Sequence, residues 1–262
     1  MSARPHLVLL TRVPVPGRVK TRLLGALSGV QCARLQRALA LDAVERLAAL
    51  RLPLTVRYSD EVQGDDPLLR GFLADVRGAW KRGGGRGSLR LETQRGDGLG
   101  ARMASAIEDE LAHGAAGCLL MGSDLPLLGA ELLAPAVAMF GGDSPSGTAK
   151  KTPEPGASRP GLDVTPAPHV VLGPTDDGGY WLVGLRRPFG ELFAGKRYGS
   201  GGVLEEALAT CRAHGRTAAL GPATRDVDTP DDLRQLAALV AAGDPRVGRR
   251  TAQVVRSLGR LE

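Results

Sequence analysis

Two adjacent acids and two adjacent glycines stand between apolar runs within residues 169–185. The carboxylates of Asp176 and Asp177 could serve as general bases, and Gly178 and Gly179 permit positive φ and a close approach of a ligand to the main chain. Because loops held by two strands often carry binding and catalytic groups, the segment is a candidate active-site turn. An ordinary acidic hairpin turn has the same composition, so this segment alone leaves both interpretations open.

Two further segments place carboxylates where a hard cation could bind. Asp124 follows the apolar run 118–121 and precedes Pro126, which fixes the turn. Asp226 and Asp228 alternate, so in extended backbone both side chains face the same way. Magnesium or manganese commonly uses one or two protein carboxylates and completes its shell with water and phosphate oxygens. We expect Asp124 and Asp228 to be metal ligands, with a turn or helix-cap role as the alternative for each.

A cationic loop at 11–22 follows the first apolar run of the chain. Arg12, Lys20 and Arg22 could contact phosphates there, with Gly17 in the same loop. A P-loop is rejected because valine stands directly before the lysine, where that motif requires glycine. No G-x-G-x-x-G follows the run, which disfavours a dinucleotide fold. The loop therefore predicts a nucleotide-phosphate site, with a solvated basic loop as the alternative.

A glycine-rich stretch at 94–103 leads into a predicted helix and is a weaker candidate for nucleotide binding. Gly98 and Gly100 would let a ligand approach the helix N-terminus, where backbone N–H groups favour anions, and Arg102 adds a cation. A flexible turn explains the same residues equally well.

The elements that must position these residues follow from hydrophobic periodicity. Strands are predicted over 7–10, 54–58, 89–93, 117–122, 169–172, 180–185 and 217–220, and helices over 31–50, 67–75, 99–113, 132–140, 200–214 and from 229 onward. Strands alternating with helices are typical of an α/β fold with a mostly parallel sheet and helices on both faces. The Thr-Pro-Asp-Asp sequence at 229–232 predicts a capped helix start.

The domain prediction is a single domain over 1–262 that carries a disordered insertion at 141–168. That insertion is rich in glycine, proline, serine and threonine and has few large apolar side chains. A second segment, 81–88, is short, basic and rich in glycine. We expect neither segment to order itself.

The composition bounds the class of protein. The 262 residues contain 43% hydrophobic and 24% charged residues, and no apolar run is long enough to span a bilayer. The three cysteines lack metal spacing, and the first apolar run is too short for a signal peptide, so we expect a cytoplasmic protein. The net charge of +6 is scattered and aromatics make up only 3%, which favours a small anionic substrate over nucleic acid.

Five motifs occur in a fixed order along almost the whole chain. They are Pro-Val-Pro-Gly-Arg-Val-Lys-Thr-Arg-Leu at 14–23, Gly-Asp-Gly-Leu-Gly-Ala-Arg-Met at 96–103, Gly-Ser-Asp-Leu-Pro at 122–126, Gly-Pro-Thr-Asp-Asp-Gly-Gly-Tyr at 173–180 and Asp-Val-Asp-Thr-Pro-Asp-Asp-Leu at 226–233. Together they resemble the bacterial family of unknown-function domain 2064. Members of that family are often labelled glycosyltransferases, and some are linked to arsenosugar biosynthesis.

The resemblance implies the nucleotide-diphospho-sugar transferase superfamily and a GT-A type, Rossmann-like three-layer fold. By similarity, Lys20 and Arg22 would face the phosphates of a nucleotide or nucleotide sugar, and Asp124 and Asp228 would hold the metal. The stretch from Asp177 to Tyr180 would shape the side that binds a small-molecule acceptor. The same superfamily includes nucleotidylyltransferases of cofactor biosynthesis, which supply the alternative function.

One departure from the superfamily pattern bears on the reaction. A strict Asp-x-Asp is absent at the central strand, because Ser123 stands where the first acid would be. This weakens sugar transfer relative to nucleotidyl transfer, for which one acid at this point can suffice. The expected function is metal-assisted sugar transfer, with Asp176 or Asp177 positioning or deprotonating the acceptor hydroxyl and Gly178, Gly179 and Tyr180 contacting the acceptor. A nucleotide-binding module without turnover is the alternative outside enzymes.

Overall fold

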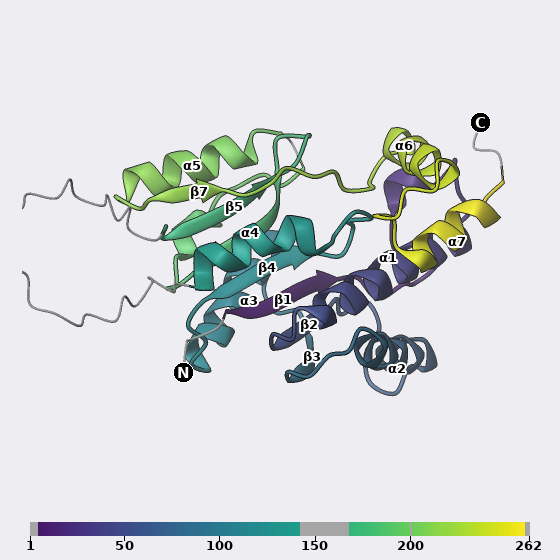
Figure 1. Cartoon of the computed structure of the whole chain (residues 1–262), viewed down its shortest axis with the longest axis horizontal. Helices are drawn as coiled ribbons and strands as arrows, with labels where there is room; N and C mark the ends of the chain where they lie inside the picture. Colours follow the sequence, from purple (N-terminus) through teal and green to yellow (C-terminus); the bar gives the residue numbers. More distant parts are fainter. Residues whose placement is uncertain (1–4, 142–167, 200, 260–262) are drawn as a thin grey trace, which may run out of the picture.

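A seven-stranded sheet forms the centre of the computed structural model, which describes residues 5–141, 168–199 and 201–259 (Figure 1). The strand order is β3-β2-β1-β4-β6-β5-β7. The strands are β1 (His6–Thr11), β2 (Leu54–Tyr58), β3 (Leu89–Thr93), β4 (Cys118–Gly122), β5 (Val170–Pro174), β6 (Tyr180–Leu185) and β7 (Ala218–Leu220). Only β6 among these strands runs antiparallel to its neighbours, so the mostly parallel sheet predicted from the sequence is confirmed.

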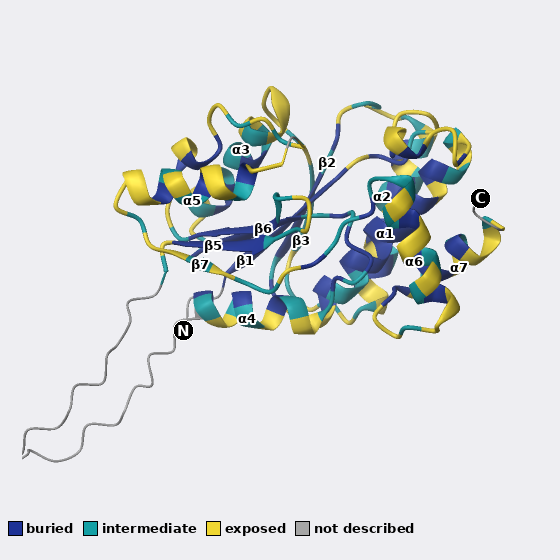
Figure 2. Cartoon of the chain, turned by 90° about the horizontal axis from the view of Figure 1, so that it is seen from above, coloured by how far each residue is buried: buried dark blue, intermediate teal, exposed yellow. Residues whose placement is uncertain are grey.

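Helices cover both faces of this sheet, which confirms the predicted three-layer α/β class (Figure 2). The helices are α1 (Gly29–Ala49), α2 (Pro67–Arg82), α3 (Gly98–Ala112), α4 (Ala130–Gly141), α5 (Val203–Ala213), α6 (Pro230–Ala241) and α7 (Arg249–Ser257), with short 3₁₀ turns η1 (Thr21–Leu23) and η2 (Gly190–Leu192). None of the helices in the described ranges is long and apolar enough to cross a membrane.

Alternation along the strands divides the apolar side chains between the two faces. On β1, Leu7 and Leu9 pack into a core with α1, α2 and α4, whereas Val8 and Leu10 pack into a second core with α3 and α5. Both faces are buried, which explains why the strands read as continuous apolar runs. A third core joins α1, α6 and α7 beyond the edge of the sheet, around Leu35.

Local capping sets where the helices begin. Ser28 and Gln31 form a reciprocal capping box at the start of α1. Thr229 and Asp232 form another at the start of α6, with Pro230 at the first helical position, as the sequence predicted. The capping box at Thr229 anchors the segment that carries Asp228, so helix-start chemistry also positions a site residue.

Several predicted boundaries are corrected by the structure. Helix α2 extends to Arg82 instead of ending near residue 75, because Phe72, Val76 and Ala79 continue its buried stripe. Helix α7 was not predicted; its short apolar side packs against α1 and α6. The predicted insertion at 141–168 lies outside the described residues except at its two ends.

Candidate active site

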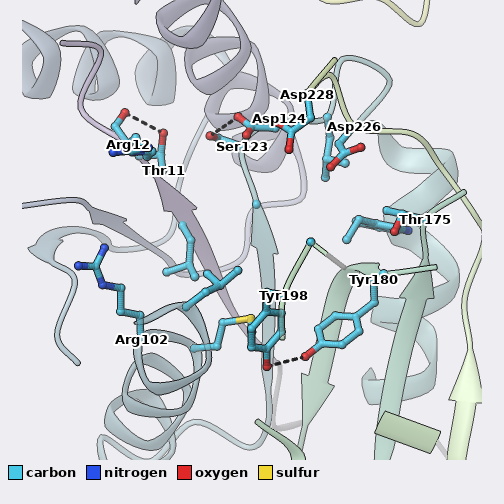
Figure 3. A pocket seen from close by; sticks show the side chains of 18 of the residues that line it. Thr11, Arg12, Arg102, Ser123, Asp124, Thr175, Tyr180, Tyr198, Asp226 and Asp228 are labelled. Carbon is cyan, nitrogen blue, oxygen red and sulfur yellow. Dashed lines mark hydrogen bonds between the residues drawn. The ribbon is translucent and has the colours of Figure 1, made fainter. Parts of the chain in front are cut away.

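A cavity of about 680 Å³ opens at the edge of the sheet where β1 and β4 end and β6 begins (Figure 3). This is the edge where open α/β sheets bind ligands. All five sequence motifs reach the cavity through at least one lining residue. Its predicted lining residues are Arg12, Arg22, Gly98, Arg102, Asp124, Asp177, Gly179, Tyr180 and Asp228, and the fold thus brings together segments more than 200 residues apart.

The residues of the motif at 14–23 divide between the wall of the cavity and the structure beneath it. Arg22 in η1 lines the cavity, whereas the side chain of Lys20 is only 1% exposed and lies beneath it. Lys20 has left-handed backbone, with φ 50°, at the start of η1. Because such backbone is uncommon for a residue with a side chain, the position is held by its surroundings.

Lys20 joins the two predicted metal ligands. Its Nζ donates to the Val227 carbonyl at 2.6 Å and lies 2.8 Å from Asp124 Oδ2 and 3.3 Å from Asp228 Oδ1. These contacts direct the ammonium at protein oxygens, so Lys20 fixes the two aspartates and does not line the cavity. In this structure Lys20 contacts the two carboxylates and a carbonyl, and its contact with phosphate stays a prediction.

The backbone and a polar relay fix Asp124 in the same arrangement. Val227 N–H donates to the Asp124 carbonyl at 3.0 Å, which ties the end of β4 to the segment before α6. Ser123 Oγ donates to Asp124 Oδ1 at 3.3 Å, and Gln36 Nε2 of α1 donates to Ser123 Oγ at 3.0 Å. Gln36 was not predicted as a site residue. Its only signal in the sequence is a polar side chain between the apolar residues that α1 buries.

Asp226 is the carboxylate that the sequence had paired with Asp228, and it also lines the cavity. Burial, together with the nearby carboxylates of Asp228, Asp177 and Asp124, raises the pKa of Asp226 to about 6, and Lys20 opposes this rise. The acids of this end thus outnumber the cations close to them. An added positive charge would relieve that repulsion.

The β5–β6 turn places its two acids differently. Asp177 lines the cavity, and its Oδ1 accepts from Thr175 Oγ1 at 2.6 Å and from Gly179 N–H at 3.0 Å. Asp176 points to the outside, where its Oδ2 accepts from Arg225 at 2.8 and 3.0 Å. The sequence predicted a catalytic role for Asp176 or Asp177. Of these two acids, only Asp177 lines the cavity.

Three predicted glycines serve the scaffold and do not line the cavity. Gly178 has φ +83°, and a Cβ there would lie 2.9 Å from the backbone of Gly202, so the turn needs glycine to approach α5. A Cβ on Gly100 would lie 2.7 Å from the Phe193 carbonyl oxygen. Gly17 has φ +77° and lies in a turn whose backbone approaches Gly29. The motif glycines thus permit close packing of the elements around the cavity.

Three arginines line the cavity, Arg12 and Arg22 from the loop at 11–22 and Arg102 from α3. Arg12 forms an ion pair with Glu61 at 2.5 Å. Arg102 lies on α3, where its guanidinium donates to the Gly96 carbonyl at 3.2 Å and to Gln94 Oε1 at 3.3 Å. Gln94 lines the cavity and was not predicted to act there. Arg22 lies 3.6 Å from Asp228 Oδ2 and is largely exposed.

The opposite end of the cavity is aromatic. Tyr180 and Tyr198 meet edge to face with ring centroids 6.4 Å apart, and their hydroxyl oxygens lie 3.2 Å apart (Figure 3). Burial raises the pKa of both phenols, so both are neutral at physiological pH. Tyr198 was not predicted as a site residue. It could have been noticed because aromatic residues are scarce in this chain and a glycine-rich stretch, 199–202, follows it directly.

The donor set can be tested for its fit to a divalent cation. In the part of the chain that the structure describes, no group of three or more His, Cys, Asp or Glu side chains is placed to hold a metal ion. Asp124 and Asp228 both face the cavity, are 36% and 41% exposed and already converge on one positive charge, that of Lys20. Two converging carboxylates fit magnesium, which takes its other ligands from water and phosphate.

Comparison with known proteins shows a family likeness over part of the chain. Residues 72–200 match the model of the family described as "Uncharacterized protein conserved in bacteria (DUF2064)". The matched range includes Asp124 and the β5–β6 turn, whereas Lys20 and Asp228 lie outside it. A comparison with curated proteins gives no match.

Solved structures show a likeness over the whole fold. A proposed nucleotide-diphospho-sugar transferase from Desulfovibrio desulfuricans G20 is 26% identical, with a TM-score of 0.72 over 98% of this chain and 99% of that chain. A cytidylyltransferase from Leptospira borgpetersenii is 11% identical, with a TM-score of 0.52 over 97% of this chain and 93% of that chain, and shows a shared fold alone. The chain therefore has the fold of nucleotide-sugar and nucleotidyl transferases.

Proposed function

We propose that the protein is a metal-assisted transferase that passes a sugar from a nucleotide-sugar donor to a small-molecule acceptor. The observation that carries this proposal is the convergence of Asp124 and Asp228 on the buried ammonium of Lys20, at the edge of the sheet where ligands bind. The likeness to a proposed nucleotide-diphospho-sugar transferase over nearly the full length of both chains supports it.

Asp124 and Asp228 would hold magnesium or manganese, and the bound ion would neutralise charge that develops on the departing nucleoside diphosphate. Arg22, which is exposed beside Asp228, would bind the same phosphates directly. Lys20 would keep the two carboxylates in register whether or not a nucleotide is present. Arg12 and Arg102, at the mouth, would bind the rest of the nucleotide.

Asp177 would act on the acceptor. Its Oδ1 is occupied by Thr175 and the Gly179 N–H, which fix the orientation of the carboxylate. The second oxygen, Oδ2, would accept a hydrogen bond from the nucleophilic hydroxyl of the acceptor and take its proton during attack. Gly179 and Tyr180 follow on the same wall of the cavity and would contact the acceptor.

Nucleotidyl transfer is the second candidate, and one feature favours it. Because position 123 is a serine, Asp124 is the single acid at the end of β4. The Ser123 hydroxyl donates to Asp124 and accepts a hydrogen bond from Gln36. In that reaction the same site would bind a nucleoside triphosphate, and pyrophosphate would leave after attack by a phosphorylated acceptor. The two candidates share their binding residues and differ in the bond that breaks.

A thermal-shift panel identifies the nucleotide. Nucleoside triphosphates, diphosphates and nucleotide sugars are added with and without magnesium to the wild-type protein and to Asp124→Asn. Binding to the folded state raises the melting temperature, so the true ligand should give the largest magnesium-dependent shift in the wild type. The site as assigned is wrong if no nucleotide shifts the wild type, or if Asp124→Asn keeps the magnesium-dependent shift.

Product analysis then separates the two reactions. Incubation of the identified ligand with a pool of small acceptors should release nucleoside diphosphate if sugar is transferred. Release of pyrophosphate from a triphosphate would establish nucleotidyl transfer instead.

A further inference from the structure

The cavity has two chemically different ends. The end at the edge of the sheet carries the acids described above, with Arg22 beside Asp228 (Figure 3). The other end reaches between the sheet and helices α3 and α5, where its walls continue the second apolar core (Figure 3). The residues of this apolar end are Leu10, Met103, Leu120, Tyr180, Val183 and Tyr198.

Much of the wall of the apolar end is buried. Val183 is 0% exposed and Leu120 is 2% exposed although both line the cavity. The charged lining residue next to Met103 in the sequence is Arg102, and its guanidinium donates to Gly96 and Gln94. A phosphate or a polyhydroxylated sugar ring would lose its hydration there without gaining partners, whereas an apolar group would gain free energy by leaving water.

The tyrosine pair adds one polar feature to these walls. The Tyr180 and Tyr198 hydroxyls lie 3.2 Å apart, and among the described residues neither has another hydrogen-bond partner. One hydroxyl donates to the other, so one O–H of the pair stays available as a donor. A neutral phenol pair of this kind suits a ligand that presents a single hydrogen-bond acceptor.

The position of the pair indicates which substrate it meets. Tyr180 begins β6 directly after the turn that carries Asp177 and Gly179, the groups assigned to the acceptor. The polar groups suited to a nucleotide, Arg12 and Gln94, directly follow β1 and β3, which lie on the other side of β4 from β6.

We propose that the acceptor carries an apolar ring with one hydrogen-bond acceptor atom, and that Tyr180, Tyr198 and Met103 hold this ring in the apolar end. The assignment to the acceptor rests on the proposed function. Tyr198 is then a specificity-determining residue.

Binding of a simple ring alcohol tests this directly. Benzyl alcohol is titrated by ligand-observed NMR, with glycerol as the polar probe. We expect benzyl alcohol to bind the wild type with a Kd on the order of 1 mM and glycerol not to bind. Tyr198→Phe, which keeps the ring, should weaken benzyl alcohol roughly threefold to tenfold, and Tyr198→Ala more than about tenfold. Tyr58→Ala, a tyrosine outside the cavity, should leave the Kd unchanged.

Equal binding of benzyl alcohol by wild type, Tyr198→Phe and Tyr198→Ala would overturn the proposal, as would binding of glycerol with the same affinity. Displacement of benzyl alcohol by a free nucleoside would place the nucleobase in the apolar end and overturn the assignment to the acceptor. The proposed function fails separately: its magnesium-dependent nucleotide shift requires Asp124 and does not involve Tyr198.

Discussion

At the scale of single residues, Lys20 organises the acidic end of the cavity. A buried ammonium shared by Asp124 and Asp228 keeps two carboxylates close that would otherwise repel each other. The sequence indicated that all three residues belong to a phosphate and metal site. It did not indicate that Lys20 contacts the carboxylates, because that contact depends on how η1 meets the segment before α6, more than 200 residues away.

The two acids of the β5–β6 turn provide a matched pair of variants. Asp177→Asn should lower kcat by about 10²-fold or more, because the amide keeps the turn's hydrogen bonds but cannot take a proton. Asp176→Asn should change kcat less than about threefold, because Asp176 only forms an exposed ion pair with Arg225. Steady-state product release measures both. A larger loss for Asp176→Asn would reverse the assignment.

At the scale of elements, alternation of apolar residues was enough to predict the sheet and most helices. The strands 89–93 and 180–185 match their predicted bounds, because turn residues flank them on both sides. Helix α7 was not predicted, because its nine residues carry only a narrow apolar stripe. The helix is stabilised by the packing of this stripe against α1 and α6. The glycines were read as ligand contacts, but Gly100 and Gly178 serve packing between elements that the sequence does not show to be neighbours.

Two helix glycines should respond to alanine in opposite directions. In Gly100→Ala, the new Cβ would lie 2.7 Å from the Phe193 carbonyl oxygen and 3.1 Å from Tyr198 Cε2, so we expect a loss of about 1–3 kcal/mol in unfolding free energy. Gly71→Ala in α2 meets nothing within 4 Å and should gain about 0.5–1 kcal/mol from helix propensity. Urea unfolding measures both. A stable Gly100→Ala would show that α3 does not need this close approach.

At the scale of the whole molecule, the faces of the sheet are not equivalent. The face toward α3 contains a buried polar cluster at β1, β2 and β3, in which His6 lies 3.3 Å from Glu110 and 2.9 Å from Thr55 Oγ1. Burial, together with the Arg90 and Arg57 guanidiniums, lowers the pKa of His6 to about 4. His6 is therefore neutral in the folded protein at neutral pH.

This cluster predicts a pH dependence of global stability. Unfolded His6 binds a proton below about pH 6.5, whereas folded His6 does so only near pH 4. The contribution of neutral His6 to the free energy of unfolding is therefore fully present above pH 6.5 and is lost as the pH falls from 6.5 to 4. The contribution of His6 to the free energy of unfolding, taken as the difference between the wild type and His6→Gln, should be about 2 kcal/mol lower at pH 5 than at pH 7. The raised pKa of Asp226 acts in the opposite direction and is present in both proteins. Urea unfolding at both pH values checks this, with His6→Gln as the matched variant. An equally steep profile for His6→Gln would assign the effect to other groups.

The central claim is that Asp124 and Asp228 hold a divalent cation beside a nucleotide. Electron paramagnetic resonance of Mn²⁺, titrated in the presence of the nucleotide with the largest thermal shift, tests it most directly. The wild type should bind about one Mn²⁺ per chain, and Asp228→Asn should weaken that binding at least about tenfold. Asp231→Asn, which removes an exposed acid paired with Arg234 on α6, should match the wild type. Unchanged Mn²⁺ binding in Asp228→Asn would contradict the claim.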